Sequence, residues 1–342
     1  MSANPRHHLP ATPPRSHSRR LMLQATGAAL AAPWAFAAQA AGQIAGGKPV
    51  TLVVSYAAGG GADLMARLIA PRMAEFLGQP VLVDNKPGAG GQIAATLVAR
   101  AVPDGTQLLV DASSFAVNPA LYPKLPYDID TAFTPLAVLA QFPNVLVCTP
   151  GFEAKSVKDL IRLAKAKPGQ IAYASSGNGS AQHLAGALFE DLAGVKLVHV
   201  PYRGGGPAMN DVMAGQVPLF FANVASSLGQ IQSGRLRPLA VTSRRRTRSL
   251  PDMPTMEEAG VPAYEVLEWN PVLAPAGIDA KSKAALIAAI RKTMADPEVL
   301  GRIRALSGEA FPEGPEGLTQ AFLKAQQLKW GRIIKDRKIT VG

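Results

Sequence analysis

Short apolar runs along this chain alternate with longer segments in which apolar residues recur every three or four positions. The first run begins at Val50, and its β-branched residues predict a buried strand. Three glycines at 59–61 follow and allow a tight turn, because glycine has no Cβ to clash at positive φ. Apolar residues at helical spacing then predict an amphipathic helix over 64–77.

The same alternation continues to the end of the chain and predicts an α/β protein. A strand, a helix and a strand within about 35 residues form a unit that requires a parallel sheet with a right-handed crossover. We expect strands at 50–54, 81–84, 107–110, 136–139, 145–148, 171–174, 198–200, 219–221 and 239–241. We expect helices at 64–77, 92–101, 157–167, 181–192, 207–213, 226–233, 281–294, 297–306 and 315–335. The stretch 119–134 contains three prolines and is expected to be irregular.

Two strand–loop–helix units share one arrangement, at 50–64 and again at 171–181, where a loop of small polar residues opens a helix. The free N–H groups and the positive dipole end of such a helix suit an anion, such as a phosphate or a carboxylate. A chain of 342 residues is long enough for two domains. We therefore assign 48–144 and 265–342 to a first lobe and 145–264 to a second, with the two loops facing each other across a cleft.

Residues 1–40 have the features of an export signal. Arg19 and Arg20 precede an uncharged stretch rich in Leu and Ala, and Ala38-Gln39-Ala40 matches the small-x-small cleavage pattern. The paired arginines resemble a twin-arginine signal, and an ordinary secretory signal is the alternative. We expect cleavage near Ala40 and a periplasmic mature protein.

The positive charge of the chain does not predict a nucleic-acid binder. The net charge is +11, but residues 1–40 hold four arginines and no acidic residue, which leaves 31 basic and 24 acidic residues beyond them. Part of this excess is one arginine cluster at 244–248, with no interleaved aromatic residues of the kind that single-strand binders use. The single cysteine, Cys148, excludes an intramolecular disulfide and lies in a predicted buried strand.

The glycine loops do not match nucleotide-binding motifs. Leu64 and Ile93 stand where the third glycine of a dinucleotide loop would be, and neither loop contains Gly-Lys-Ser/Thr. A Gly-x-Ser-x-Gly nucleophile motif is also absent from the sequence. Beyond residue 40 there are two histidines, His183 and His199, and one cysteine, so we expect neither a metal site nor a cofactor.

Asp63 and His183 are the residues from which an acid–base pair would have to be built. As the first acidic residue of a helix, Asp63 suits the macrodipole and is able to hold the glycine loop through backbone N–H groups. His183 lies a few residues into a helix, where it either reaches the cleft or serves as a structural hydrogen-bonder. Without a convincing partner for catalysis, the pattern favours a solute-binding protein, with an exported enzyme as the alternative.

The sequence resembles the Bug (Bordetella uptake gene) or TctC-like substrate-binding proteins of tripartite tricarboxylate transporters. The resemblance runs from about 48 to 338 and rests on a set of short motifs that are specific only together. They are Ala58-Gly59-Gly60-x-x-Asp63, Asp84-Asn85-Lys86-Pro87-Gly88-Ala89-Gly90-Gly91, Pro103-Asp104-Gly105, Tyr173-Ala174-Ser175-Ser176-Gly177-Asn178-Gly179, His183-Leu184-Ala185-Gly186, His199-Val200-Pro201-Tyr202 and Leu250-Pro251-Asp252-x-Pro254-Thr255.

The resemblance implies a type II periplasmic-binding-protein fold, in which two lobes enclose a ligand cleft. It implies a monomer that holds a small organic carboxylate between the loops at 56–63 and 175–180, partly through water. Such a protein delivers its ligand to membrane permease subunits or, as the alternative, serves as an orphan receptor in sensing. The candidate ligand-binding residues are Tyr56, Ala58, Gly59, Gly60, Asp63, Ser113, Ser175, Ser176, Gly177, Asn178, Ser180, His183, Ala222, Asn223 and Trp269.

Two departures from the family pattern bear on the ligand. Gly61 and Ala62 stand where relatives commonly have Ser and Thr, and Ala222 stands where they often have Asp. An acid at 222 would suit a cationic or hydroxyl group on the ligand. Its absence leads to the hypothesis of a carboxylate without an amino group, whose body packs against Trp269 and Phe115.

Overall fold

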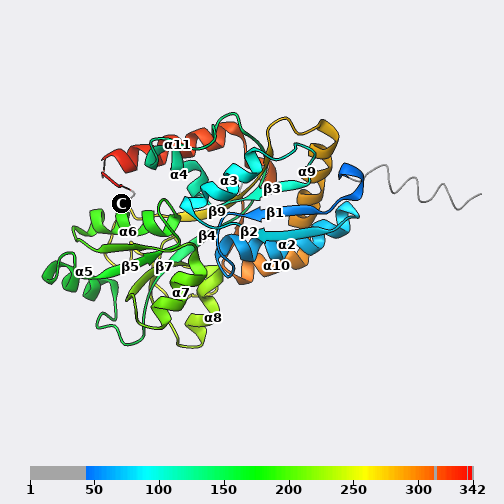
Figure 1. Cartoon of the computed structure of the whole chain (residues 1–342). Helices are drawn as coiled ribbons and strands as arrows, with labels where there is room; N and C mark the ends of the chain where they lie inside the picture. Colours follow the sequence, from blue (N-terminus) through cyan, green and yellow to red (C-terminus); the bar gives the residue numbers. More distant parts are fainter. Residues whose placement is uncertain (1–43, 312–313, 337, 341–342) are drawn as a thin grey trace, which may run out of the picture. The chain divides into compact units, whose positions relative to one another are not determined.

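The computed structural model of the protein describes residues 44–311, 314–336 and 338–340. The predicted export signal and its cleavage near Ala40 lie outside these residues. Within them, helices cover strands on both faces, which makes the architecture α/β (Figure 1). No helix in this part of the chain combines the length and apolar character needed to cross a membrane.

The first sheet is built on three parallel strands. They are β1 (Val50–Val54), β2 (Val81–Asn85) and β3 (Gln107–Val110), with β1 in the middle. Helices pack on both faces of β1, which explains why its sequence is a continuous apolar run rather than an alternating one. One face is covered by α2 (Gly61–Leu77), α9 (Ala280–Ala295) and α10 (Pro297–Ala305). The other face is covered by α3 (Gln92–Ala99), α4 (Ser114–Leu121) and α11 (Gln320–Asp336).

The second sheet contains the middle strands of the chain. They are β5 (Ala172–Ser175), β6 (Val198–Pro201), β7 (Leu219–Asn223) and β8 (Arg237–Val241). The covering helices are α5 (Val157–Ala166), α6 (Ala181–Ala193), α7 (Gly205–Met213) and α8 (Val224–Gln232). Two separate apolar clusters fill this part, one under α5 and α6 and the other under α7.

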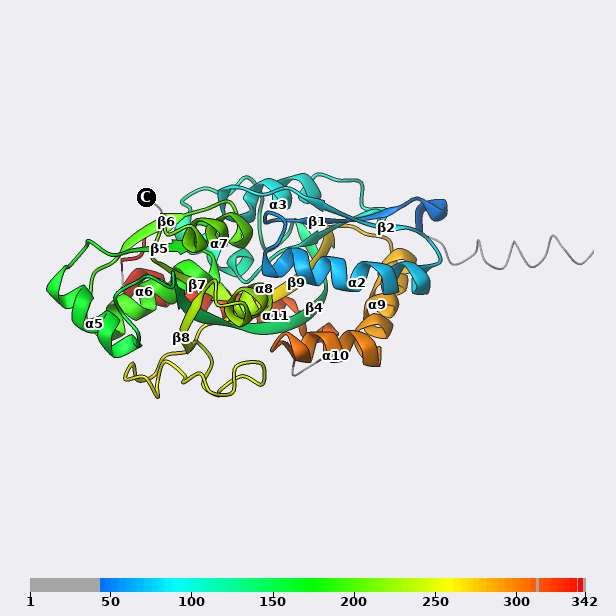
Figure 2. The same ribbon diagram turned by 90° about the horizontal axis from the view of Figure 1, so that it is seen from below.

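Two long antiparallel strands connect the sheets. They are β4 (Phe133–Cys148) and β9 (Leu267–Pro275), and both views show them passing between the two groups of helices (Figures 1 and 2). Up to Pro143, β4 pairs with β9, and from Asn144 it pairs with β7 and β8. The strand order is β2-β1-β3-β9-β4-β7-β5-β6, and β10 (Glu309–Ala310) also pairs with β4.

The structure corrects three sequence-based expectations. The strands expected at 136–139 and 145–148 are one strand, since Pro143 remains paired with Leu267 although it lacks an N–H. The stretch 119–134 is not irregular throughout, because it includes the end of α4 and the start of β4. Burial of Phe115, Val117 and Leu121 in two cores holds α4 as a helix despite Pro119 inside it. The long final helix begins at Gln320, not at 315, after a separate 3₁₀ turn (Pro315–Gly317).

Candidate functional site

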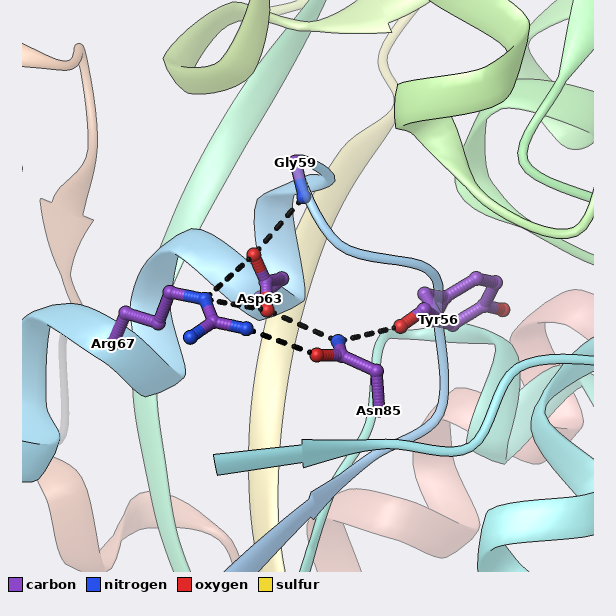
Figure 3. Close-up of polar contacts among 5 residues, drawn as sticks. All are labelled: Tyr56, Gly59, Asp63, Arg67 and Asn85. Carbon is purple, nitrogen blue, oxygen red and sulfur yellow. Dashed lines mark hydrogen bonds and ion pairs between the residues drawn. The ribbon is translucent and has the colours of Figure 1, made fainter. Parts of the chain in front are cut away.

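The carboxylate of Asp63 fixes the shape of the first glycine loop, at 56–63, through hydrogen bonds. Its Oδ2 accepts a hydrogen bond from the Gly59 N–H (3.0 Å), and its Oδ1 accepts one from the Asn85 side chain (3.0 Å). The Nε of Arg67 donates to both carboxylate oxygens, and Asn85 also donates to the Tyr56 carbonyl (2.8 Å), as Figure 3 shows. The carboxylate of Asp63 is therefore already engaged by the loop that it shapes.

The side chain of Tyr56 lies between this loop and the end of β3. Its hydroxyl is 2.6 Å from the hydroxyl of Ser114, and both residues are buried. Asp111, at the end of β3, is fully buried, and burial raises the pKa of its carboxyl to about 7 although the Ala112 N–H donates to it. The candidate Ser113 follows and is also buried, away from the cavities described below.

Two stacked histidines support the second loop, at 175–180. The Nδ1 of His183 accepts a hydrogen bond from the Gly179 N–H (3.1 Å), and the Nε2 of His199 is 2.6 Å from the Ser175 hydroxyl. The two rings lie 3.9 Å apart at an angle of 5°. Burial lowers the pKa of His183 to about 4, and burial together with His183 lowers that of His199 to about 3. Both imidazoles are neutral near pH 7, and His183 belongs to the support of the loop.

A third loop, at 203–206, touches the first one directly, although it was not among the predicted site residues. The Ala57 N–H donates to the Arg203 carbonyl (3.2 Å). A Cβ placed on Gly206 would lie 2.4 Å from the Ala58 carbonyl oxygen, and one on Gly204 would lie 2.7 Å from the Ala57 nitrogen. Only residues without a side chain allow this approach, so the second glycine triplet in the sequence was the signal for this contact.

A buried polar group forms the floor between the loops. Glu268, on β9, accepts a hydrogen bond from the side chain of Gln182 (2.6 Å), which also donates to Asn144 (3.1 Å). Burial raises the pKa of Glu268, and the amides of Gln182, Asn223 and Asn270 act in the opposite direction. Glu268 and Gln182 were not among the predicted site residues, because nothing in a single sequence shows which face of β9 or α6 meets the cleft.

Two neighbouring spaces lie between the loops, and Tyr56 and Ser176 line both. The narrow one, about 10 Å³, is bounded by the floor and is lined by Gly60, Gly61, Ala62, Ala112, Gln182, Gly205, Phe220, Asn223, Ser226 and Glu268. The wider one, about 200 Å³, is lined by Gly88, Ala89, Gly90, Gly91, Tyr122, Gly177, Asn178, Pro201, Tyr202 and Arg203. Glu268 is the charged residue of the narrow space, and Arg203 is that of the wider space.

The structure sorts the candidate residues into three groups. Those that line the two spaces are Tyr56, Gly60, Ser176, Gly177, Asn178 and Asn223. Those that belong to the loops or their support without lining the spaces are Ala58, Gly59, Asp63, Ser175, Ser180 and His183. Those that lie elsewhere are Ser113, Ala222 and Trp269, with Ala222 inside an apolar core.

Trp269 does not reach the loops. Successive side chains of a strand point to opposite faces, so Trp269 faces away from the floor that Glu268 forms. Its ring packs edge-to-face against Phe322, with centroids 5.1 Å apart, and lines a separate hollow of about 180 Å³. Phe115 is fully buried and packs edge-to-face against Phe133. The expected aromatic wall for the ligand is therefore not at the cleft.

A sequence model of the family described as "Tripartite tricarboxylate transporter family receptor" matches residues 65–339. The chain belongs to this receptor family. The receptor is 34% identical over 291 residues to BugT of Bordetella pertussis, a match that covers 84% of this chain and 89% of BugT. The family resemblance found in the sequence is thus confirmed.

Solved structures of three relatives have the same fold. The receptor is similar to the periplasmic binding protein BugD, with 36% identity, a TM-score of 0.82 and coverage of 85% of this chain and 98% of BugD. It is similar to an R. palustris protein solved with adipate, with 35% identity, a TM-score of 0.82 and coverage of 85% and 98%. It is also similar to MatC from Rhodopseudomonas palustris with bound malate, with 32% identity, a TM-score of 0.79 and coverage of 84% and 98%.

These relatives confirm the periplasmic-binding-protein fold with two lobes and a cleft. They also show that the family consists of solute-binding receptors and not of enzymes. The geometry agrees, because Asp63 and His183 are held in separate hydrogen-bond networks, one under each loop. The acid–base pair of the alternative interpretation is therefore not supported.

Proposed function

We propose that this receptor binds a small organic carboxylate between the loops at 56–63 and 175–180. The observation that carries the proposal is the space of about 200 Å³ that residues of both loops line, with Arg203 as its charged residue. The adipate and malate in the structures of two relatives support this class of ligand. Backbone N–H groups at the start of α2, which has no side-chain cap, lie at the adjacent narrow space.

The receptor would hold its ligand by closing two lobes, 48–144 with 265–342 and 145–264, about β4 and β9. The contact between Ala57 and Arg203 joins residues on opposite sides of this division and supports such closure. Tyr56, Gly60, Ser176, Gly177, Asn178 and Asn223 would face the ligand. Asp63 and His183 would keep the two loops in shape without touching it.

The receptor would act in the periplasm as a monomer, after removal of the signal at 1–40, and would deliver its ligand to the permease subunits of a tripartite transporter. The family supports this role. Deletion of the gene should abolish uptake of the ligand, and uptake should return with the intact gene. Unchanged uptake in the deletion strain would contradict the delivery role.

A thermal-shift screen of carboxylic acids, each paired with its uncharged amide, tests the binding proposal directly. A ligand at about 100 times its Kd adds about 2.7 kcal/mol to the free energy of unfolding, which is a readily measured shift. We expect stabilisation by acids and none by the amides. If no acid stabilises the protein, or if the amides act equally well, the proposed function is wrong.

Arg203 provides a second test with a matched control. Arg203→Gln removes the charged residue of the wider space and should raise the Kd for the acid roughly tenfold, because a hydrogen bond to a charged group contributes about 1.5 kcal/mol or more. Arg245→Gln removes an exposed arginine far along the chain from the loops and should leave the Kd unchanged. Equal effects of the two changes would mean that only the net charge matters.

A further inference from the structure

The carboxyl group of Glu268 is buried without an ion-pair partner. The residue is 4% exposed, and in the described part of the chain no lysine or arginine lies within ion-pair distance of it. A buried carboxylate is costly unless hydrogen bonds or a partner compensate for the lost water. Burial of Glu268 at the floor of the cleft therefore either serves ligand binding or only lowers the stability of the fold.

The side chains around Glu268 act as donors. The amide of Gln182 donates to its Oε2, and the amides of Asn223 and Asn270 favour its charged form. Asn144 accepts from the same Gln182 nitrogen, so the Gln182 amide is oriented with its donor toward Glu268. The hydrogen bond from Gln182 and the nearby Asn223 nitrogen therefore place Glu268 as a hydrogen-bond acceptor, the role of a carboxylate, which accepts and does not donate.

Gly61 leaves open the space in front of the other carboxylate oxygen. A Cβ at position 61 would lie 3.1 Å from the Oε1 of Glu268 and 2.8 Å from the Asn223 nitrogen. The narrow space bounded by Gly61 and Glu268 measures about 10 Å³. This is about the volume that one water-sized group needs, so the space suits a single hydroxyl or ammonium group and not a carbon chain.

We propose that Glu268 determines specificity by accepting a hydrogen bond from a hydroxyl or ammonium group that the carboxylate ligand carries. The ligand's carboxylate lies in the wider space, beside Arg203, and its donor group enters the narrow space beside Glu268. This inference rests on the proposed function. Glu268, on β9, supplies the acid that position 222 lacks. The presence of Ala222 therefore no longer restricts the ligand to carboxylates without an amino group.

Matched acids that differ only in the donor group test the proposal. Succinate, malate and aspartate carry no donor, a hydroxyl and an ammonium group at the same position, and analogous sets exist for five- and six-carbon chains. We expect titration calorimetry to show at least tenfold tighter binding of a hydroxy or amino acid than of its unsubstituted partner. Comparison of the two substituted acids tells whether the group is a hydroxyl or an ammonium.

Two variants connect this preference to Glu268. Glu268→Gln keeps the shape of the side chain but loses its charge and should reduce the preference to less than threefold, while the unsubstituted acid still binds. Glu265→Gln changes a partly exposed carboxylate outside the cleft, paired with Arg244, and should retain the full preference. Circular dichroism of the unliganded variants checks that both are folded.

The possible outcomes separate the two levels of the proposal. If the unsubstituted acids bind the unmodified protein as tightly as their partners, the role of Glu268 is wrong and the carboxylate receptor stands. The same conclusion follows if Glu268→Gln folds and keeps the full preference. If no acid of any chain length binds, the proposed function itself fails.

Discussion

Replacing Gly206 with alanine should weaken ligand binding without weakening the fold. The new Cβ would lie 2.4 Å from the Ala58 carbonyl oxygen, where an ordinary contact needs about 3.4 Å or more. The two loops would have to separate by about 1 Å. Gly206 is the second residue of α7 and has no positive φ, so alanine is compatible with its backbone and improves the helix slightly.

The expected size of this effect follows from the cost of overpacking. Extra methyl groups in tightly packed places cost about 1–3 kcal/mol. If the cost falls only on the closed protein, the Kd for the ligand should rise about 5- to 160-fold. The melting temperature of the unliganded protein should stay the same or rise.

Titration calorimetry with the best acid from the thermal-shift screen would measure this change. Gly229→Ala is the matched control, because Gly229 also lies within a helix, α8, and a Cβ there meets nothing within 4 Å. It should leave the Kd unchanged. An unchanged Kd for Gly206→Ala, or an equal loss for both variants, would refute the idea that the loops must touch when the ligand is bound.

Three further changes test the supports of the site. Asp63→Ala should lower the free energy of unfolding by about 1–3 kcal/mol and weaken binding, because it leaves buried donors of the first loop unpaired; urea unfolding and calorimetry measure both. Burial lowers the pKa of folded His183, so between pH 6.5 and 4 the unfolded chain binds a proton that the folded chain does not. The contribution of His183 to the free energy of unfolding should therefore fall by about 3 kcal/mol between neutral pH and pH 4, and His183→Gln should remove this contribution. Gly186→Ala should lower the melting temperature despite better helix propensity, because its Cβ would lie 2.1 Å from the ring of Tyr173.

Each of these has an outcome that would contradict it. Unchanged binding by Asp63→Ala would mean that the first loop keeps its shape without the carboxylate. The pH slope of His183→Gln must be compared with that of the unmodified protein, because the lowered pKa of His199 acts in the same sense as that of His183 and the raised pKa of Asp111 acts in the opposite sense. A Gly186→Ala variant with a normal melting temperature would show that Tyr173 has room to move.

The local pattern predicted most elements because it follows from contacts close in sequence. The β1 run, the glycine turn and α2 could be predicted from periodicity and turn chemistry alone. Helix α4 could not, since its stability comes from packing against cores formed by distant residues. The strands expected at 136–139 and 145–148 are likewise one strand, because pairing with β9 continues through Pro143.

The sequence indicated which loops border the two spaces, but it did not indicate which side chains lie between those loops. Small polar residues at helix starts identified the loops at 56–63 and 175–180. Trp269 was chosen in place of Glu268 because the choice between adjacent residues of a strand depends on its register. That register is set by pairing with β4, which no pattern within β9 reveals.

The two long connecting strands also determine the order in which the molecule becomes complete as it is synthesised. Phe133 pairs with Pro275 and Phe142 with Glu268, so the first sheet lacks a central strand until the chain reaches β9. The second sheet has no such dependence and is able to form earlier. The N-terminal strands are therefore synthesised first, but their sheet is completed last. Until β9 pairs with them, β3 and β4 keep open edges that could pair with other chains. A chain that stops before Leu267 should aggregate rather than form a smaller working protein.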